Sequence, residues 1–189
     1  MSVVAAVRSH PVRAAALGVT ALAIVAFGLY WFGPQYLFVD RTVHEAPPSI
    51  AAGTGARGPG AAPAGGDRNG GDNRAPMTLA EGAFRGLEHD SSGRALIVSL
   101  ADGTTFLRLE DLMTSNGPDL RVYLSDRRAS DDWYVYDDGR FVDLGPLKGN
   151  IGSSNYVISR EIDLGDYRSA VVWCRRFSVG FAVAPLDRP

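Results

Sequence analysis

The stretch AVVWCRRFSVGFAV, residues 170–183, decides the fold class, because it places two strand patterns next to each other. In its first part, residues 170–174 are β-branched, aromatic or small, a composition typical of strands. In its second part, large apolar residues alternate with small ones, which is the pattern of a half-buried strand. The large residues of this part are Phe177, Val179, Phe181 and Val183. The stretch therefore predicts two short β-strands near the end of the chain.

The same period-two pattern recurs upstream, and turn-forming residues separate the segments. Strands are predicted at residues 95–100, 104–109, 120–125, 132–136, 155–159, 170–174 and 177–183. Asp-Gly pairs at 101–103 and 137–140 have the chemistry of tight hairpin turns. Because no convincing helix pattern lies between these segments, residues 77–186 are predicted to form an all-β domain, an antiparallel β-sandwich of about 7–9 strands.

Residues 14–32, AAALGVTALAIVAFGLYWF, contain no charge and predict a membrane-spanning helix. Trp31 and Tyr36, at its C-terminal end, suit the membrane interface, and arginines stand on its N-terminal side. We therefore predict a transmembrane signal-anchor helix over 14–36 and a short cytoplasmic N-terminus over 1–13. The rest of the chain is then expected outside the cytoplasm, at the cell membrane. A cleaved signal peptide is the alternative, but the apolar run ends in bulky residues rather than in a small-residue cleavage motif.

Residues 46–76 predict a disordered linker between the anchor and the domain. The segment has eight glycines and five prolines, and Ile50 is its only large apolar residue. Such a composition cannot bury enough apolar surface to offset the entropy lost on ordering. We therefore expect a flexible tether that lets the domain turn freely near the membrane.

Charge and residue counts exclude several function classes. A formal net charge of -2 without a long basic run argues against nucleic acid as a partner. One cysteine and three histidines are too few for an ordinary zinc site. The aspartate pairs at 131–132 and 137–138 are more typical of turns than of a calcium site, so no metal site is predicted. No catalytic constellation is found, which favours a protein that is not an enzyme.

Cys174 is the only cysteine of the chain, and two arginines follow it at once. Outside the cytoplasm structural cysteines come in pairs, so an unpaired thiol there is unusual. On a regular strand Cys174 shares a face with Val172 and Arg176, while Trp173 lies on the other face. Burial would raise the pKa of the thiol, and a neighbouring guanidinium would lower it. The sequence leaves open whether Cys174 is an inert core residue or an accessible thiolate.

Three motifs occur in the order and spacing of a known family. They are LRLEDLMTSNGPDLRVYLS (107–125), DLGPLKGNIGSSNYVI (143–158) and YRSAVVWCRRFSVGFAVAPL (167–186). Together they resemble the DM-thirteen domain family, also called the electron-transfer DM domain, over essentially the whole predicted domain. The resemblance implies a β-sandwich similar to the haem- and sugar-binding DOMON domains, and a role in redox or electron transfer.

The resemblance also places Cys174 in the family's VxIWCxxF pattern. Val171, Trp173 and Phe177 match that pattern, and Val172 stands where isoleucine is common. The implied role of Cys174 is either that of a bare redox thiol or that of a ligand to a prosthetic group such as haem.

A haem would need a second ligand, for which His89, Met77 and Met113 are the candidates in the domain. No C-x-x-C-H motif is present for covalent attachment of a haem. Between a bound haem and no cofactor, we therefore expect no cofactor. In the second motif the glycines have a structural explanation, since glycines 145, 149 and 152 permit a compact turn. Lys148, beside them, is expected to be solvated.

Two functions from different classes follow. The leading hypothesis is a membrane-anchored, extracytoplasmic module with a redox or electron-transfer role through Cys174. Its partners are the membrane, through the helix, and an unidentified protein or redox partner. The alternative is a surface binding module in which Cys174 is a structural core residue, and the aromatic side chains of residues 131–139 contact a partner or a glycan.

Overall fold

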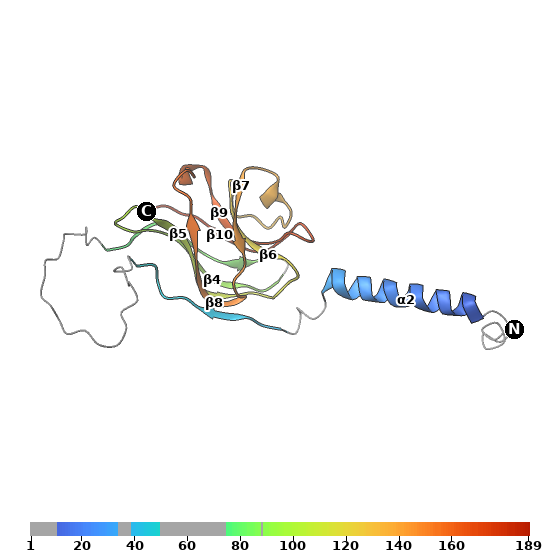
Figure 1. Cartoon of the computed structure of the whole chain (residues 1–189). Coiled ribbons are helices and arrows are strands. Elements are labelled where there is room, and N and C mark those ends of the chain that lie inside the picture. Colours follow the sequence, from blue (N-terminus) through green and yellow to red (C-terminus); the bar gives the residue numbers. More distant parts are fainter. Residues whose placement is uncertain (1–10, 34–38, 50–74, 88) are drawn as a thin grey trace, which may run out of the picture. The chain divides into compact units, whose positions relative to one another are not determined.

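The computed structural model describes residues 11–33, 39–49, 75–87 and 89–189. The chain divides after Val39 into two compact units, a helical one and a β-rich one (Figure 1). Most of the predicted linker, most of the predicted cytoplasmic segment and Tyr36 lie outside the described residues.

The helical unit contains α2 (Pro11–Phe32), in which Arg13 is the only charged residue. Residues Val12–Phe32 have a mean hydropathy of 2.0, and their side chains are not buried against other parts of the protein. The helix is therefore long and apolar enough to cross a membrane. A signal sequence near an N-terminus has the same length and composition, so these properties fit both.

The β-rich unit is a sandwich of two five-stranded sheets, as predicted, with ten strands among the described residues. The first sheet has the order β1-β8-β5-β4-β2 and the second the order β3-β10-β9-β6-β7. The strands are β1 (Thr42–His44), β2 (Met77–Ala83), β3 (Arg85–Gly86), β4 (Ser92–Ser99), β5 (Thr105–Met113), β6 (Leu120–Ser125), β7 (Phe141–Pro146), β8 (Ile151–Ile158), β9 (Ser169–Cys174) and β10 (Val179–Pro185). Neighbouring strands are antiparallel, except that β1 and β8 run parallel.

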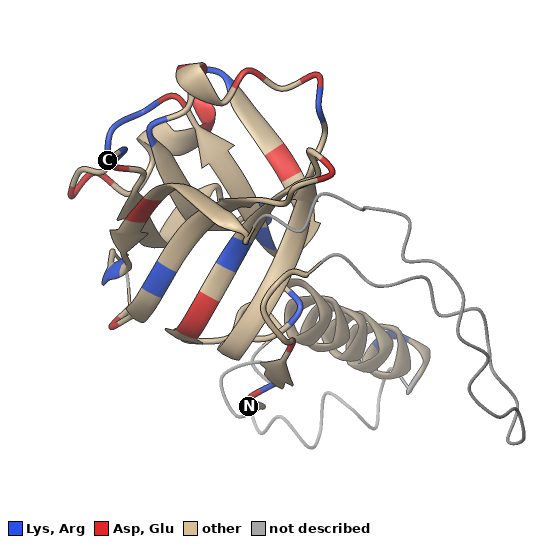
Figure 2. Cartoon of the chain, turned by 90° about the vertical axis from the view of Figure 1, so that its left-hand side faces the viewer, with Lys and Arg blue, Asp and Glu red and all other residues tan. Residues whose placement is uncertain are grey.

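The main core lies between the sheets and is built by the alternating residues of the central strands. Leu107 and Leu109 of β5 and Val122 and Leu124 of β6 are almost completely buried in it. Each fully buried aliphatic side chain of this size stabilises the fold by about 1.5–3 kcal/mol. Acidic and basic residues are interspersed along the strands and loops of the domain, whereas the helix is almost free of charge (Figure 2).

A second, smaller cluster covers the outer face of the second sheet and explains one wrong prediction. Residues 132–136 were predicted as a strand, but a 3-10 turn (Val135–Asp137) lies there instead. Tyr136 of this turn is fully buried in the cluster beside Trp173. Its hydroxyl donates to the Ser130 carbonyl at 2.8 Å and accepts from the Ser130 amide at 3.0 Å. The apolar residues of this segment therefore pack onto the face of a sheet instead of forming a strand of it. As a result, the Asp-Gly pair at 138–139 does not form the tight hairpin turn that was predicted.

β10 also differs from its prediction. The strand begins at Val179, so the half-exposed Phe177 lies in the preceding turn. A bulge between Gly180 and Ala182 then shifts the alternation by one residue. As a result Phe181 and Ala182 both belong to the main core, and Val183 belongs to the outer cluster.

Candidate functional site

Cys174 is the last residue of β9, opposite Leu120 of β6 and Val179 of β10. Its side chain lies in the main core with Val172 and is 0% exposed, whereas Trp173 lies in the outer cluster, as the alternation predicts. A strand end would ordinarily bring a side chain near water. Here the neighbouring strands β6 and β10 both have a buried residue opposite Cys174, so the thiol is shielded from solvent.

Burial is the largest influence on the thiol and raises the pKa of Cys174. Hydrogen bonds from the backbone amides of Phe177, Arg176 and Asp119 act in the opposite direction, but they do not outweigh it. Because the pKa is raised above its ordinary value, the thiol is protonated at neutral pH. The three amides nevertheless give the sulfur a polar side at the end of the strand.

Arg175, the arginine next to Cys174 in sequence, binds Asp119 rather than the thiol. The Arg175 amide donates to the Asp119 carbonyl at 3.0 Å, and its Nε donates to the Asp119 carboxylate at 2.9 Å. These contacts join the end of β9 to the residue before β6. The Asp119 carboxylate adds to the rise in the Cys174 pKa, so this end of the strand disfavours the thiolate.

The other candidate ligands are not gathered around the sulfur. Met113 is 59% exposed and Met77 is 60% exposed. His89 is half-buried, and its ring meets the edge of the Phe181 ring at 4.8 Å between centroids. Phe181 belongs to the same core as Cys174, so His89 is the candidate that borders that core. Among the described residues no group of three or more His, Cys, Asp or Glu side chains is placed to hold a metal.

Two surface hollows of about 370 and 360 Å³ lie near the C-terminus of the described chain. Residues of β2 and Asp187 line the first, and Arg128, Arg168 and Leu186 line part of the second. Neither hollow is lined by Cys174 or His89. They therefore add nothing to a site at the sulfur.

The aromatic loop that the sequence offered as a binding surface is held in place and partly exposed. The Trp133 carbonyl accepts a hydrogen bond from the Gly180 amide at 2.7 Å, which fixes the loop to β10. Tyr134 is 61% exposed and Trp133 is 37% exposed. An ion pair between Asp131 and Arg85 holds the start of the loop. A fixed loop with accessible aromatic rings suits contact with a partner.

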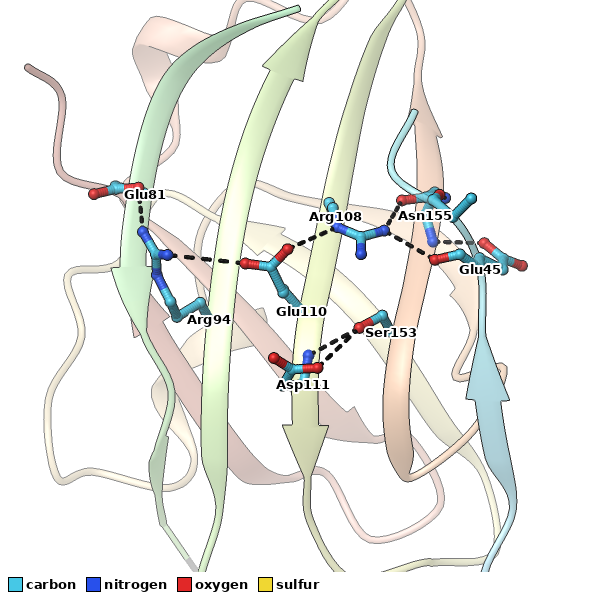
Figure 3. Close-up of polar contacts among 9 residues, drawn as sticks. Glu45, Glu81, Arg94, Arg108, Glu110, Asp111, Ser153 and Asn155 are labelled. Carbon is cyan, nitrogen blue, oxygen red and sulfur yellow. Dashed lines mark hydrogen bonds and ion pairs between the residues drawn. The ribbon is translucent and has the colours of Figure 1, made fainter. Parts of the chain in front are cut away.

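A ladder of charged residues that the sequence analysis missed crosses the outer face of the first sheet (Figure 3). Arg94 pairs with Glu81 at 2.5 Å and with Glu110 at 3.8 Å, and Glu110 pairs with Arg108 at 3.2 Å. Arg108 continues the ladder to Asn155 at 3.0 Å. Its members come from distant parts of the sequence, so only the strand order brings them together. The half-exposed pair of Arg94 and Glu81 stabilises the fold by about 1 kcal/mol or less, whereas Arg108 is buried at 6% exposure.

A model of the electron transfer DM13 family matches residues 83–186. The chain belongs to the electron transfer DM13 family. This match covers more than half of the 189 residues and confirms the resemblance seen in the three motifs. No curated protein and no solved structure matches the chain. The DM13 match begins at the last residue of β2, so β1 lies outside it.

Proposed function

We propose that this protein is a membrane-anchored electron-transfer module that presents its DM13 domain outside the cytoplasm and uses the Cys174 thiol as its redox group. Membership in the electron transfer DM13 family is the observation that carries the proposal. The apolar helix α2 supplies the anchor, because its length matches the hydrocarbon core of a bilayer. Cys174 is the only thiol available for the chemistry.

The chemistry open to a single thiol is exchange with a disulfide of a partner protein. The Cys174 thiol gives its proton to a base, and its sulfur forms a bond to one sulfur of the partner disulfide. The bond between the two partner sulfurs breaks, and the second partner sulfur leaves as a thiolate. The partner's disulfide, which is the oxidant, is thus replaced by a mixed disulfide with Cys174.

This exchange requires the end of β9 to open, because the sulfur is closed off in the described structure. The turn after Cys174 suits that opening. Ser178 has a positive φ of 50°, which a residue with a side chain rarely adopts, and Phe177 is 40% exposed. Separation of Val179 from Cys174 at this end would expose the sulfur without unfolding the centre of the sheets.

The described residues do not fit a haem. The sulfur is packed among apolar side chains, and the two candidate methionine ligands, Met77 and Met113, are largely exposed. The two hollows near the C-terminus do not include Cys174. We therefore assign the redox role to the thiol itself.

The second candidate is a surface binding module in which Cys174 is only a core residue. The complete burial of Cys174 favours it, together with the exposed rings of Trp133 and Tyr134. The two candidates differ in one property, which is whether the sulfur becomes accessible while the rest of the domain stays folded.

Alkylation of Cys174 in the intact protein, held in detergent micelles, separates the candidates. Iodoacetamide labelling is measured by mass spectrometry at several urea concentrations below the unfolding transition. The redox proposal predicts a labelling rate that depends only weakly on urea, because a local opening exposes little surface. A rate that rises as steeply with urea as global unfolding does would leave Cys174 as a core residue. The Cys174→Ser variant supplies the unlabelled control.

A further inference from the structure

Residues 148–155, KGNIGSSN, lead into β8 and form its first part, and the short edge strand β1 binds along them. β1 pairs in parallel with β8, with Thr42 opposite Ile151 and His44 opposite Ser153. The Glu45 amide donates to the Ser153 carbonyl at 2.8 Å, just beyond the strand. The segment that follows the helix in sequence is therefore part of the sandwich.

Two glycines make room for this strand. A Cβ on Gly152 would lie 2.1 Å from the Val43 carbonyl oxygen, and one on Gly149 would lie 2.5 Å from the Arg41 carbonyl oxygen. Both distances are far below a normal contact. Gly152 also has a φ of 104°, which a residue with a side chain would adopt only under strain. A side chain at either position would therefore displace β1.

At one end of the docked segment, a carboxylate is bound from two sides. The Lys148 ammonium lies 2.8 Å from Oε1 of Glu45, and the Asn155 amide donates to Oε2 at 2.7 Å. The sequence predicted a solvated Lys148, but its ammonium group is paired with the Glu45 carboxylate. Although partial burial alone would raise the pKa of Glu45, the hydrogen bonds from Lys148 and Asn155 lower it on balance.

The backbone around Glu45 is bound as well. The Glu45 carbonyl accepts from Arg108 at 3.2 Å, and the Ala46 carbonyl accepts from the Asn155 side chain at 2.8 Å (Figure 3). The charged ladder of the first sheet therefore ends on the docked segment. Two consecutive backbone carbonyls and one carboxylate are recognised at this end.

At the other end, Asn150 holds the start of the segment. Its side-chain oxygen accepts from the Arg41 amide at 2.7 Å, and its side-chain nitrogen donates to the Asp40 carboxylate at 2.8 Å. The same nitrogen donates to the Thr114 carbonyl at 2.9 Å, which orients the amide. Asn150 is only 1% exposed, so its bonds are shielded from water.

We propose that the edge formed by residues 148–155 is a peptide-docking site of the DM13 domain, and that its occupant is the segment 40–46 of the same chain. The site recognises an extended peptide by strand addition, with a carboxylate at the position of Glu45. The segment lies outside the matched family region, so the domain edge binds it as an added strand. Docking then attaches the domain to the helix through residues 33–39, and the glycine-rich segment 50–74 becomes a connection within the domain.

Cutting the intact protein tests this docking. A protease recognition sequence is inserted within residues 50–74 and cleaved after the protein, tagged at its N-terminus, has been purified in detergent micelles. The proposal predicts that the fragment beginning at residue 75 stays bound to the tagged fragment. Glu45→Ala should weaken that retention by about 10- to 100-fold, because it removes hydrogen bonds to a charged group. Glu161→Ala, at an exposed carboxylate outside the docked segment, is the matched control.

Three results would overturn the proposal. One is release of the domain fragment as soon as the chain is cut. Another is retention that Glu45→Ala does not reduce, which would mean that other contacts hold the fragments. The third is exchange of domain fragments between differently tagged chains mixed before cutting, which would make a second copy the occupant. Thermal unfolding of each cut sample verifies that the domain itself remains folded.

Discussion

At the scale of single residues, Cys174 combines two properties that ordinarily exclude each other. It is completely buried and its pKa is raised, as in an inert core cysteine. It also ends its strand, with three backbone amides directed at the sulfur and a turn beside it that contains the positive φ of Ser178. The proposed redox role therefore requires a local movement at this end of the strand that exposes the sulfur.

The packing role of the sulfur can be measured separately from its chemistry. We expect Cys174→Ala to lower the free energy of unfolding by about 1–2 kcal/mol, because it removes one buried group and leaves a small cavity. Met113→Ala removes a larger side chain, but one that is 59% exposed, and should change stability by less than about 0.5 kcal/mol. Urea unfolding of the two variants checks this. A larger loss from Met113→Ala would contradict the described burial.

At the scale of elements, local patterns predicted the central strands well because each carries a strong alternation of its own. β4, β5, β6, β8 and β9 all overlap their predicted ranges. β7 was missed because Gly145 and Pro146 resemble a turn, although an edge strand tolerates them. β1 has only three residues, and the segment around it is held by residues distant in sequence, such as Asn150 and Asn155. No short-range pattern reports such partners.

The same limit applies to the candidate site. The face on which Cys174 lies could be predicted from alternation along β9. Its burial could not, since that depends on Leu120 and Val179 continuing the neighbouring strands to the same level. The role of Gly149 and Gly152 likewise becomes visible only when β1 is placed against them.

Docking of β1 should depend on pH. The pKa of Glu45 in the folded protein lies below its ordinary value of 4.5. The ionised carboxylate, facing Lys148 and Arg108, therefore contributes stability that is fully present above about pH 4.5 and is lost as pH falls through the lowered pKa. In the cut protein, retention of the domain fragment should stay constant from about pH 7 to about pH 4.5 and should fall as the pH is lowered further. Glu45→Gln, which cannot ionise, should lack this step; an identical step in that variant would contradict the assignment.

At the scale of the whole molecule, the chain combines an apolar helix with a DM13 sandwich whose first strand follows the helix closely in sequence. Nine residues, 33–41, separate Phe32 from Thr42. Under the proposed function, in which the helix is the membrane anchor, the redox partners of the domain would lie near the membrane surface.

The central claim is that Cys174 exchanges disulfides while the domain is folded. Its most direct test is incubation of the intact, folded protein in micelles with oxidised glutathione, followed by mass spectrometry. The account predicts one glutathione per chain, bound through a disulfide at Cys174, removed by reduction and absent from Cys174→Ala. An adduct that forms only after the protein has been unfolded would contradict the claim and would make Cys174 a core residue of a binding module.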